Sequence, residues 1–165
     1  MTSTCSYVQV TVQKWNPVTK RHEDPIDIPI KKLYDMNHNL TLNKLRDQLA
    51  DHMYTRTTND GIRGAGYIVL SENNTAPAVG DTTLSGETAL SGLTRADATT
   101  KSHSAGTNTT SISHQFTAGA AGTIMKAALF NASSTGDPYH AAVFASNAVL
   151  AINDLLTVTF TITHA

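Results

Sequence analysis

Residues 155–163 read LLTVTFTIT and alternate apolar with threonine side chains, which is the period of a strand that buries one face. Leu156, Val158, Phe160 and Ile162 are predicted to face a core, with the threonines toward solvent or a neighbour. A slip of one residue would turn the whole apolar set outward, so this alternation determines which face is buried. The stretch predicts a protein built mainly from β-sheet.

The same signal recurs through the C-terminal half, in segments bounded by Gly, Ser, Asn, Asp or Pro. Their spacing is typical of an antiparallel sheet protein. Strands are predicted at Leu93 to about Thr100, Thr109–Thr117, Gly122–Phe130, His140–Ala145 and Leu155–Thr163. Both faces of the 122–130 segment are apolar, which predicts a central strand or one covered by another subunit. The expected fold class is mainly β, an antiparallel β-sandwich or barrel.

The N-terminal part adds further elements. Alternating valines predict a strand over about residues 6–15, and Ile26, Ile28 and Ile30 alternate beside two prolines. Proline removes a backbone donor, so the isoleucine segment is expected to form an edge strand or an extended arm. From residue 41 to about 54, leucines recur at spacings of three and four, which predicts one short amphipathic α-helix.

A buried strand is expected at residues 66–71, followed by a long surface loop rich in turn residues. The length of this loop suggests a role at an interface or rim. Residues 1–165 fit one β-rich domain, in which residues 1–39 form an N-terminal arm and strand region and residues 40–165 the main body.

Composition restricts the function. The chain has 165 residues, a formal net charge of -1 and a pI near 6.6, so no overall positive field favours nucleic acid or an anionic membrane. No apolar stretch reaches the roughly 20 residues that span a bilayer, and the N-terminus lacks the pattern of a signal peptide. We expect no nucleic-acid partner and no membrane partner.

Catalytic and metal-binding patterns are weak. There is no G-x-S-x-G elbow, and the only cysteine, Cys5, lies in a predicted strand without a nearby histidine. His103, His114 and His140 are scattered, without the close pair of a typical zinc site. The sequence therefore predicts a protein that is not an enzyme, with no cofactor and no metal.

Four segments, taken in order, carry a resemblance. They are GYIVLSENNTAPAVGDTTLSGE at 66–87, GLTRADATT at 92–100, GTIMKAALFNASSTG at 122–136 and AINDLLTVTFTITHA at 151–165. Together they resemble a recurrent set of small structural proteins of tailed bacteriophages, some described as head-decorating and others as tail-fibre-like. The resemblance covers about residues 40–165 and leaves residues 1–39 outside it.

The resemblance implies a virion protein, made in the host cytoplasm, that binds the major capsid protein or other virion subunits and forms a homo-oligomer. A capsid decoration or cementing subunit is the first expectation, and a tail-associated or tail-fibre-like receptor-binding module is the alternative. Interface positions are predicted at Trp15, Ile26, Ile28, Ile30 and Tyr139. Core or intersubunit packing is expected for Leu129, Phe130, Tyr139 and Phe144.

Overall fold

A computed structural model describes residues 3–28 and 64–164. This part of the chain is mainly β, and it contains no helix. The predicted helix at 41–54 and the predicted interface residue Ile30 lie outside the described residues. The strands are β1 Ser3–Gln13, β2 Trp15–Asn16, β3 Arg21–His22, β4 Ile26–Ile28, β5 Tyr67–Ser71, β6 Ala96–Asp97, β7 Thr100–His103, β8 Thr109–Thr117, β9 Gly122–Phe130, β10 Pro138–Leu150 and β11 Leu155–His164.

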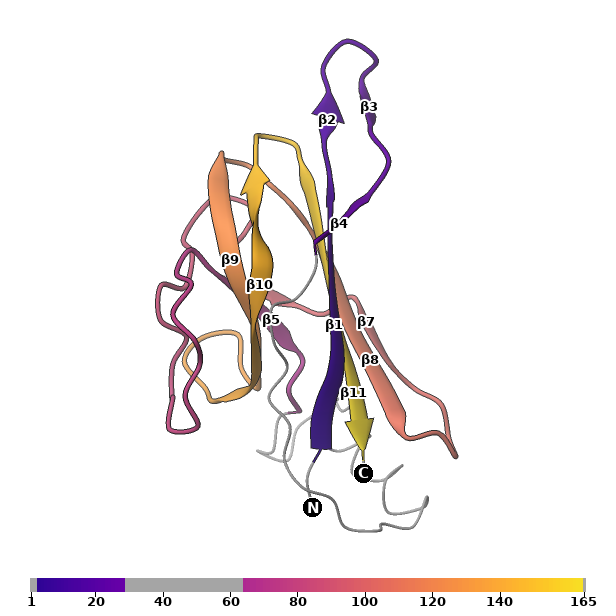
Figure 1. The fold of residues 1–165 in the computed structure, drawn as a ribbon, viewed down its shortest axis with the longest axis vertical. Coiled ribbons are helices and arrows are strands. Elements are labelled where there is room, and N and C mark those ends of the chain that lie inside the picture. Colours follow the sequence, from indigo (N-terminus) through magenta and orange to yellow (C-terminus); the bar gives the residue numbers. More distant parts are fainter. Residues whose placement is uncertain (1–2, 29–63, 165) are drawn as a thin grey trace.

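The strands form two antiparallel sheets and a separate small hairpin (Figure 1). One sheet has five strands in the order β4-β1-β11-β8-β7, and the other has four in the order β10-β9-β5-β6. The chain passes from the second sheet to the first between β6 and β7, so the segment predicted as one strand at 93–100 is divided between the sheets. Neither sheet closes on itself, and the barrel alternative is wrong.

The inner faces of both sheets contribute to one hydrophobic core. Leu156, Val158, Phe160 and Ile162 of β11 are all fully buried there, which confirms the prediction from their alternation. The four-stranded sheet adds Ile68 and Leu70 from β5, Ile124, Ala127 and Leu129 from β9, and Ala142, Phe144, Ala148 and Leu150 from β10.

Strand β9 lies between β10 and β5, so its predicted central position is confirmed. Leu129 faces the shared core, whereas Ala128 and Phe130 belong to a second apolar cluster with Val69 and Leu84. Leu84 comes from residues 72–95, which we call the covering loop. This loop therefore buries the outer face of its own four-stranded sheet.

One of the two strands that shape the surface agrees with its prediction, and the other differs from it. Strand β4 is the edge of the five-stranded sheet, as its prolines indicated. Strand β10 is longer than the predicted 140–145, and its register on β9 shifts between Val143 and Ala148. The residues between them include three exposed ones, 145–147, because an irregular strand segment lifts side chains out of the ladder.

Candidate protein interface at the projecting hairpin

The β2–β3 hairpin extends beyond the two sheets at one end of the molecule (Figure 1). Its connecting residues, 17–20, turn because the Asn16 side-chain oxygen accepts hydrogen bonds from the N–H groups of Val18 at 3.0 Å and Thr19 at 3.1 Å. Trp15 pairs across the hairpin with His22, and their rings meet edge to face with centroids 5.1 Å apart. Local contacts thus shape this element.

The base of the hairpin is attached to the turn between β10 and β11 through Asp154. One carboxylate oxygen accepts from Lys14 Nζ at 2.6 Å and from the Ala151 N–H at 2.9 Å, and the other accepts from the Trp15 N–H at 2.9 Å. Lys14 Nζ also donates to the Val149 carbonyl at 2.6 Å. Three of these contacts join the hairpin base to the β10–β11 region, and the fourth, from the Ala151 N–H, holds the Asp154 carboxylate within its own turn.

The charge of Asp154 is stabilised inside the protein. Burial alone would raise the pKa of its carboxyl, but the Ala151 N–H, the Lys14 ammonium and the Trp15 N–H together hold that pKa below its ordinary value. The carboxylate is thus ionised at neutral pH, in the form that accepts all these hydrogen bonds.

Exposed apolar side chains gather around this end. Of the six large exposed hydrophobic residues in the described ranges 3–28 and 64–164, four belong here: Val18 (89% exposed), Ile26 (59%), Val149 (62%) and Ile152 (58%). We call the hairpin residues 15–22, Ile26 and these two residues of the β10–β11 region the hairpin end. Several large apolar side chains exposed toward one end of a molecule favour a protein-binding site at that end.

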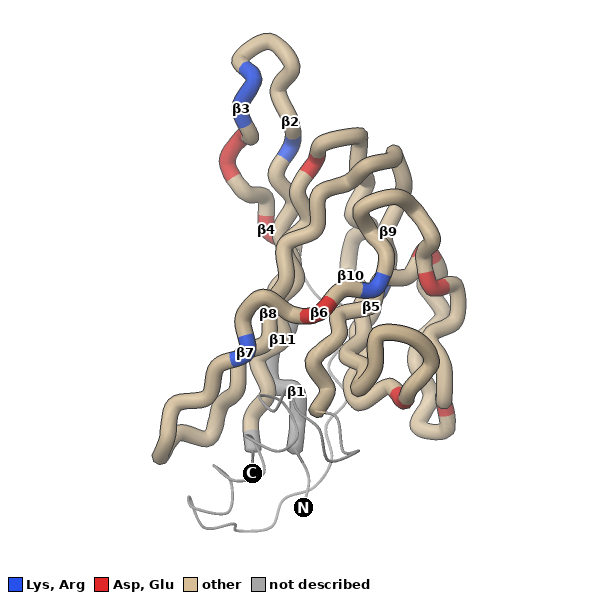
Figure 2. Tube along the Cα trace, turned by 180° about the vertical axis from the view of Figure 1, so that it is seen from behind, with Lys and Arg blue, Asp and Glu red and all other residues tan. Residues whose placement is uncertain are grey.

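Charged residues of both signs accompany the apolar ones. Figure 2 shows basic residues at the start of β3 and acidic residues between β3 and β4. Arg21, Glu23, Asp24 and Asp27 are all exposed. An apolar centre beside charged groups is the usual composition of an interface with another protein.

The predicted interface residues are distributed between different environments. Trp15 is half-buried at the base of the hairpin, and Ile26 is exposed beside it. Ile28, by contrast, is buried: its side chain is only 9% exposed and lies in the hydrophobic core of its own chain. Tyr139 is 37% exposed at the start of β10, apart from the hairpin end.

The predicted packing residues Leu129, Phe130 and Phe144 are all buried within the chain. Sequence reasoning missed Val18, Val149 and Ile152, because neither periodicity nor a motif distinguishes them. The nearest signal in the sequence was Lys14, which precedes Trp15 at the start of the hairpin. Its ammonium group needs a hydrogen-bond acceptor. Its partner Asp154 is 140 residues away and could not be identified from spacing.

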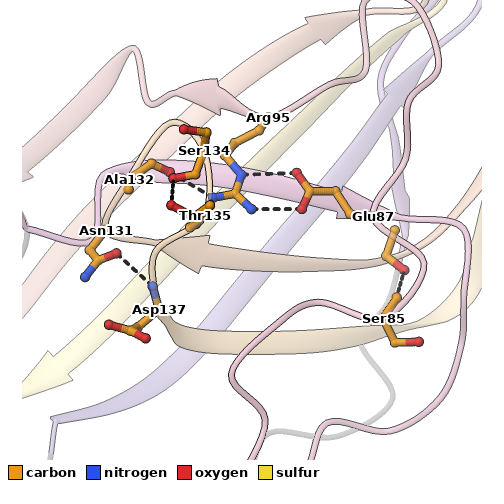
Figure 3. A network of polar contacts seen from close by, with 9 residues as sticks. Ser85, Glu87, Arg95, Asn131, Ala132, Ser134, Thr135 and Asp137 are labelled. Carbon is orange, nitrogen blue, oxygen red and sulfur yellow. Dashed lines mark hydrogen bonds and ion pairs between the residues drawn. The ribbon is translucent and has the colours of Figure 1, made fainter.

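A second polar network holds the covering loop in place (Figure 3). Arg95 donates through Nε and Nη2 to the two carboxylate oxygens of Glu87, at 3.1 and 2.8 Å, and through Nη1 to the carbonyls of Ala132 and Thr135. Its guanidinium lies 4.3 Å from the centre of the Phe130 ring. The loop that was expected at an interface is thus tied to its own sheet.

Within the described residues, no three His, Cys, Asp or Glu side chains come together as a metal site. In the same part of the chain, no helix is long and apolar enough to cross a membrane. Comparison with protein-family models, with curated proteins and with solved structures gave no match.

Proposed function

We propose that this chain is a structural subunit of a tailed-phage virion, a capsid decoration or cementing protein that binds the major capsid protein or other virion subunits. The observation that carries the proposal is the hairpin end, where exposed apolar side chains lie on a projecting hairpin and on the strands and turn next to its fixed base. In this proposal the two sheets form a β-sandwich that supports the hairpin.

The energetics suit an interface of this kind. Fully burying a large apolar side chain stabilises a complex by roughly 1.5–3 kcal/mol before the costs of association, and four such side chains are more than half exposed here. The bonds of Asp154 hold the hairpin base before binding, which reduces the entropy lost on association. Repetition in a homo-oligomer or on a symmetric capsid would multiply modest contacts.

Copy number in the intact particle tests the location. Quantitative mass spectrometry of purified virions would compare this chain with the major capsid protein. Hundreds of copies, in a simple ratio to the capsid protein, are expected for a decoration subunit. A dozen copies or fewer would assign the chain to the tail or neck, and absence from the particle would refute the proposal.

A matched pair of variants tests the surface. Val18→Asp places a charge at the exposed tip of the hairpin, where it leaves the core untouched, and should reduce incorporation into particles at least tenfold. Ala105→Asp puts the same charge at the exposed turn between β7 and β8 and should incorporate normally. Equal incorporation of both variants would show that the hairpin end is not the contact.

The alternative function, a tail-associated or tail-fibre-like receptor-binding module, is favoured by one specific observation. A groove lies beside Tyr139 on the outer face of the four-stranded sheet, and it contains both a buried lysine and an acidic side chain. A groove of this kind is better suited to binding a small ligand than to binding the surface of another protein.

A further inference from the structure

The groove is formed where the covering loop meets the first residues of β10. Its volume is about 240 Å³, and loop residues 77–85 line one side of it. Pro138 and Tyr139 line the other side, and Lys126 of β9 contributes from the sheet. This groove is separate from the hairpin end, so what it binds does not depend on the proposed protein contact.

Lys126 is unusual because a lysine is almost never fully buried without a partner. The residue is only 2% exposed, and its ammonium donates to the carbonyl of Thr75 at 3.1 Å. An ammonium has three N–H donors, and this contact uses one. Burial lowers the pKa of Lys126, and the negative charge of Asp81 opposes that effect. An acceptor oxygen brought by a ligand would stabilise the buried charge.

Asp81 supplies the opposite charge in the same groove. One of its carboxylate oxygens accepts the N–H of Ala78 at 2.8 Å, and its own N–H donates to the Ala78 carbonyl at 3.0 Å. These two bonds close a tight turn of the loop, so the carboxylate is held in a defined position. Like Lys126, Asp81 lines the groove.

Apolar groups complete the lining. Pro77, Leu84 and Pro138 lie around the groove, and Tyr139 presents a partly exposed ring that is 37% accessible. An aromatic ring with a polar end, next to apolar walls, suits a ligand that is itself apolar on one face and polar at its edge.

We propose that this groove binds one unit of a neutral saccharide, with a sugar face on Tyr139 and hydroxyl groups at Lys126 and Asp81. A hydroxyl both accepts and donates hydrogen bonds, so adjacent hydroxyls can accept from the ammonium and donate to the carboxylate. A carboxylate or phosphate ligand would satisfy Lys126 but be repelled by Asp81, and a cationic ligand would have the reverse problem. A neutral polyhydroxyl ligand satisfies both charges.

The size of the groove fits a single ring. Pockets that enclose drug-sized ligands have volumes of roughly 300–1,000 Å³, and 240 Å³ lies below that range. One sugar unit of a longer glycan would occupy it while the rest of the chain remained in solvent. With so few contacts the affinity for a monosaccharide is expected to be millimolar, and useful binding would come from multiple copies.

Amide chemical shifts of the ¹⁵N-labelled full chain would test this directly. The probes are the methyl glycosides of glucose, galactose, mannose and N-acetylglucosamine, with methyl glucuronide and acetate as anionic comparisons. At least one neutral glycoside is expected to shift the amides of residues 78–85 and 139–141 with a saturable curve, and the anions should bind more weakly. Tighter binding of an anion, or no saturable shift with any neutral glycoside, would overturn the proposal.

Variants separate the ligand contacts from the fold. Tyr139→Ala should raise the dissociation constant about three- to tenfold, while Tyr139→Phe retains the ring and should stay within about twofold. Asp81→Asn keeps an oxygen for the Ala78 N–H but loses the charge, and should also weaken binding. Gln115→Ala, on the exposed face of the other sheet, is the control and should bind like the wild type. Unchanged binding by Tyr139→Ala would contradict the assignment.

Discussion

Replacing Asp154 with alanine should lower the free energy of unfolding by about 3 kcal/mol at neutral pH. The change removes the carboxylate that accepts the part-buried hydrogen bonds of the Trp15 and Ala151 N–H groups, and a hydrogen bond to a charged group contributes about 1.5–3 kcal/mol. Lys14 adds little, because its side chain is 38% exposed and keeps the Val149 carbonyl. Total stabilities of domains are about 5–15 kcal/mol, so the variant should still fold.

The effect should depend on pH in one direction. The pKa of Asp154 is lower in the folded protein than in the unfolded chain, where it is about 3.9. The stabilisation is therefore complete above the unfolded pKa and is lost as the pH falls through the lower folded pKa. The difference between wild type and Asp154→Ala should be constant from pH 7 to 5 and shrink below about pH 4.

Urea unfolding of both proteins at a series of pH values measures this difference. Asp24→Asn, which changes an exposed carboxylate on the same hairpin, is the matched control and should differ from wild type by less than about 0.5 kcal/mol. A loss below about 1 kcal/mol for Asp154→Ala would refute the reasoning. So would a difference of unchanged size at pH 3, because it would show that the charge contributes nothing.

Three further changes test other parts of the structure. Arg95→Lys cannot reproduce the paired hydrogen bonds of the guanidinium, so urea unfolding should show a loss of about 1–2 kcal/mol, and wild-type stability would contradict that role. Ile28→Asp buries a carboxylate in the core and should lower the free energy of unfolding by about 3 kcal/mol or more. The exposed Ile26→Asp should lower it by under about 1 kcal/mol. Equal losses of stability in the two variants would show that Ile28 is not in the core. Gly92→Ala should lower the thermal midpoint sharply, because φ is +74° and the added Cβ would lie 1.9 Å from the Thr117 carbonyl oxygen; an unchanged midpoint would contradict this geometry.

Strands whose side chains alternate strictly were predictable from the sequence. Strands β8 and β9 have the bounds that were predicted, and β11 extends one residue further, to His164. In β8 and β11, the period of two is a local property that requires no knowledge of the partner strand. The two apolar faces of β9 likewise indicated its central position, because a strand covered on both sides has no polar face.

The environments of single residues were less predictable. The alternation of Ile26 and Ile28 indicated an edge strand, and β4 is one, but alternation does not tell what covers each face. Ile28 is buried because the other sheet contributes to the same core, and that packing depends on long-range folding. The length of the covering loop suggested an interface, whereas Leu84 and Arg95 attach it to its own sheet through contacts that spacing does not reveal.

The same limit applies to the candidate sites. Sequence reasoning selected Trp15 and Ile26, which lie at the hairpin end, but Val149 and Ile152 join them only through the turn that contains Asp154. Lys126 lies in the 122–130 segment, which was predicted only from its apolar faces, and its position beside the groove depends on where the covering loop packs. A charged residue inside an apolar run was the one signal that could have drawn attention to it.

The pairing of β1 with β11 brings both ends of the described chain to the side of the molecule opposite the hairpin, which is useful for attaching labels. Ser3 lies opposite His164, so the first and last described residues are adjacent, and the hairpin lies at the far end of the long axis (Figure 1). A fluorescent or affinity label attached at Ser3 or His164 would therefore lie at the end of the molecule away from the hairpin.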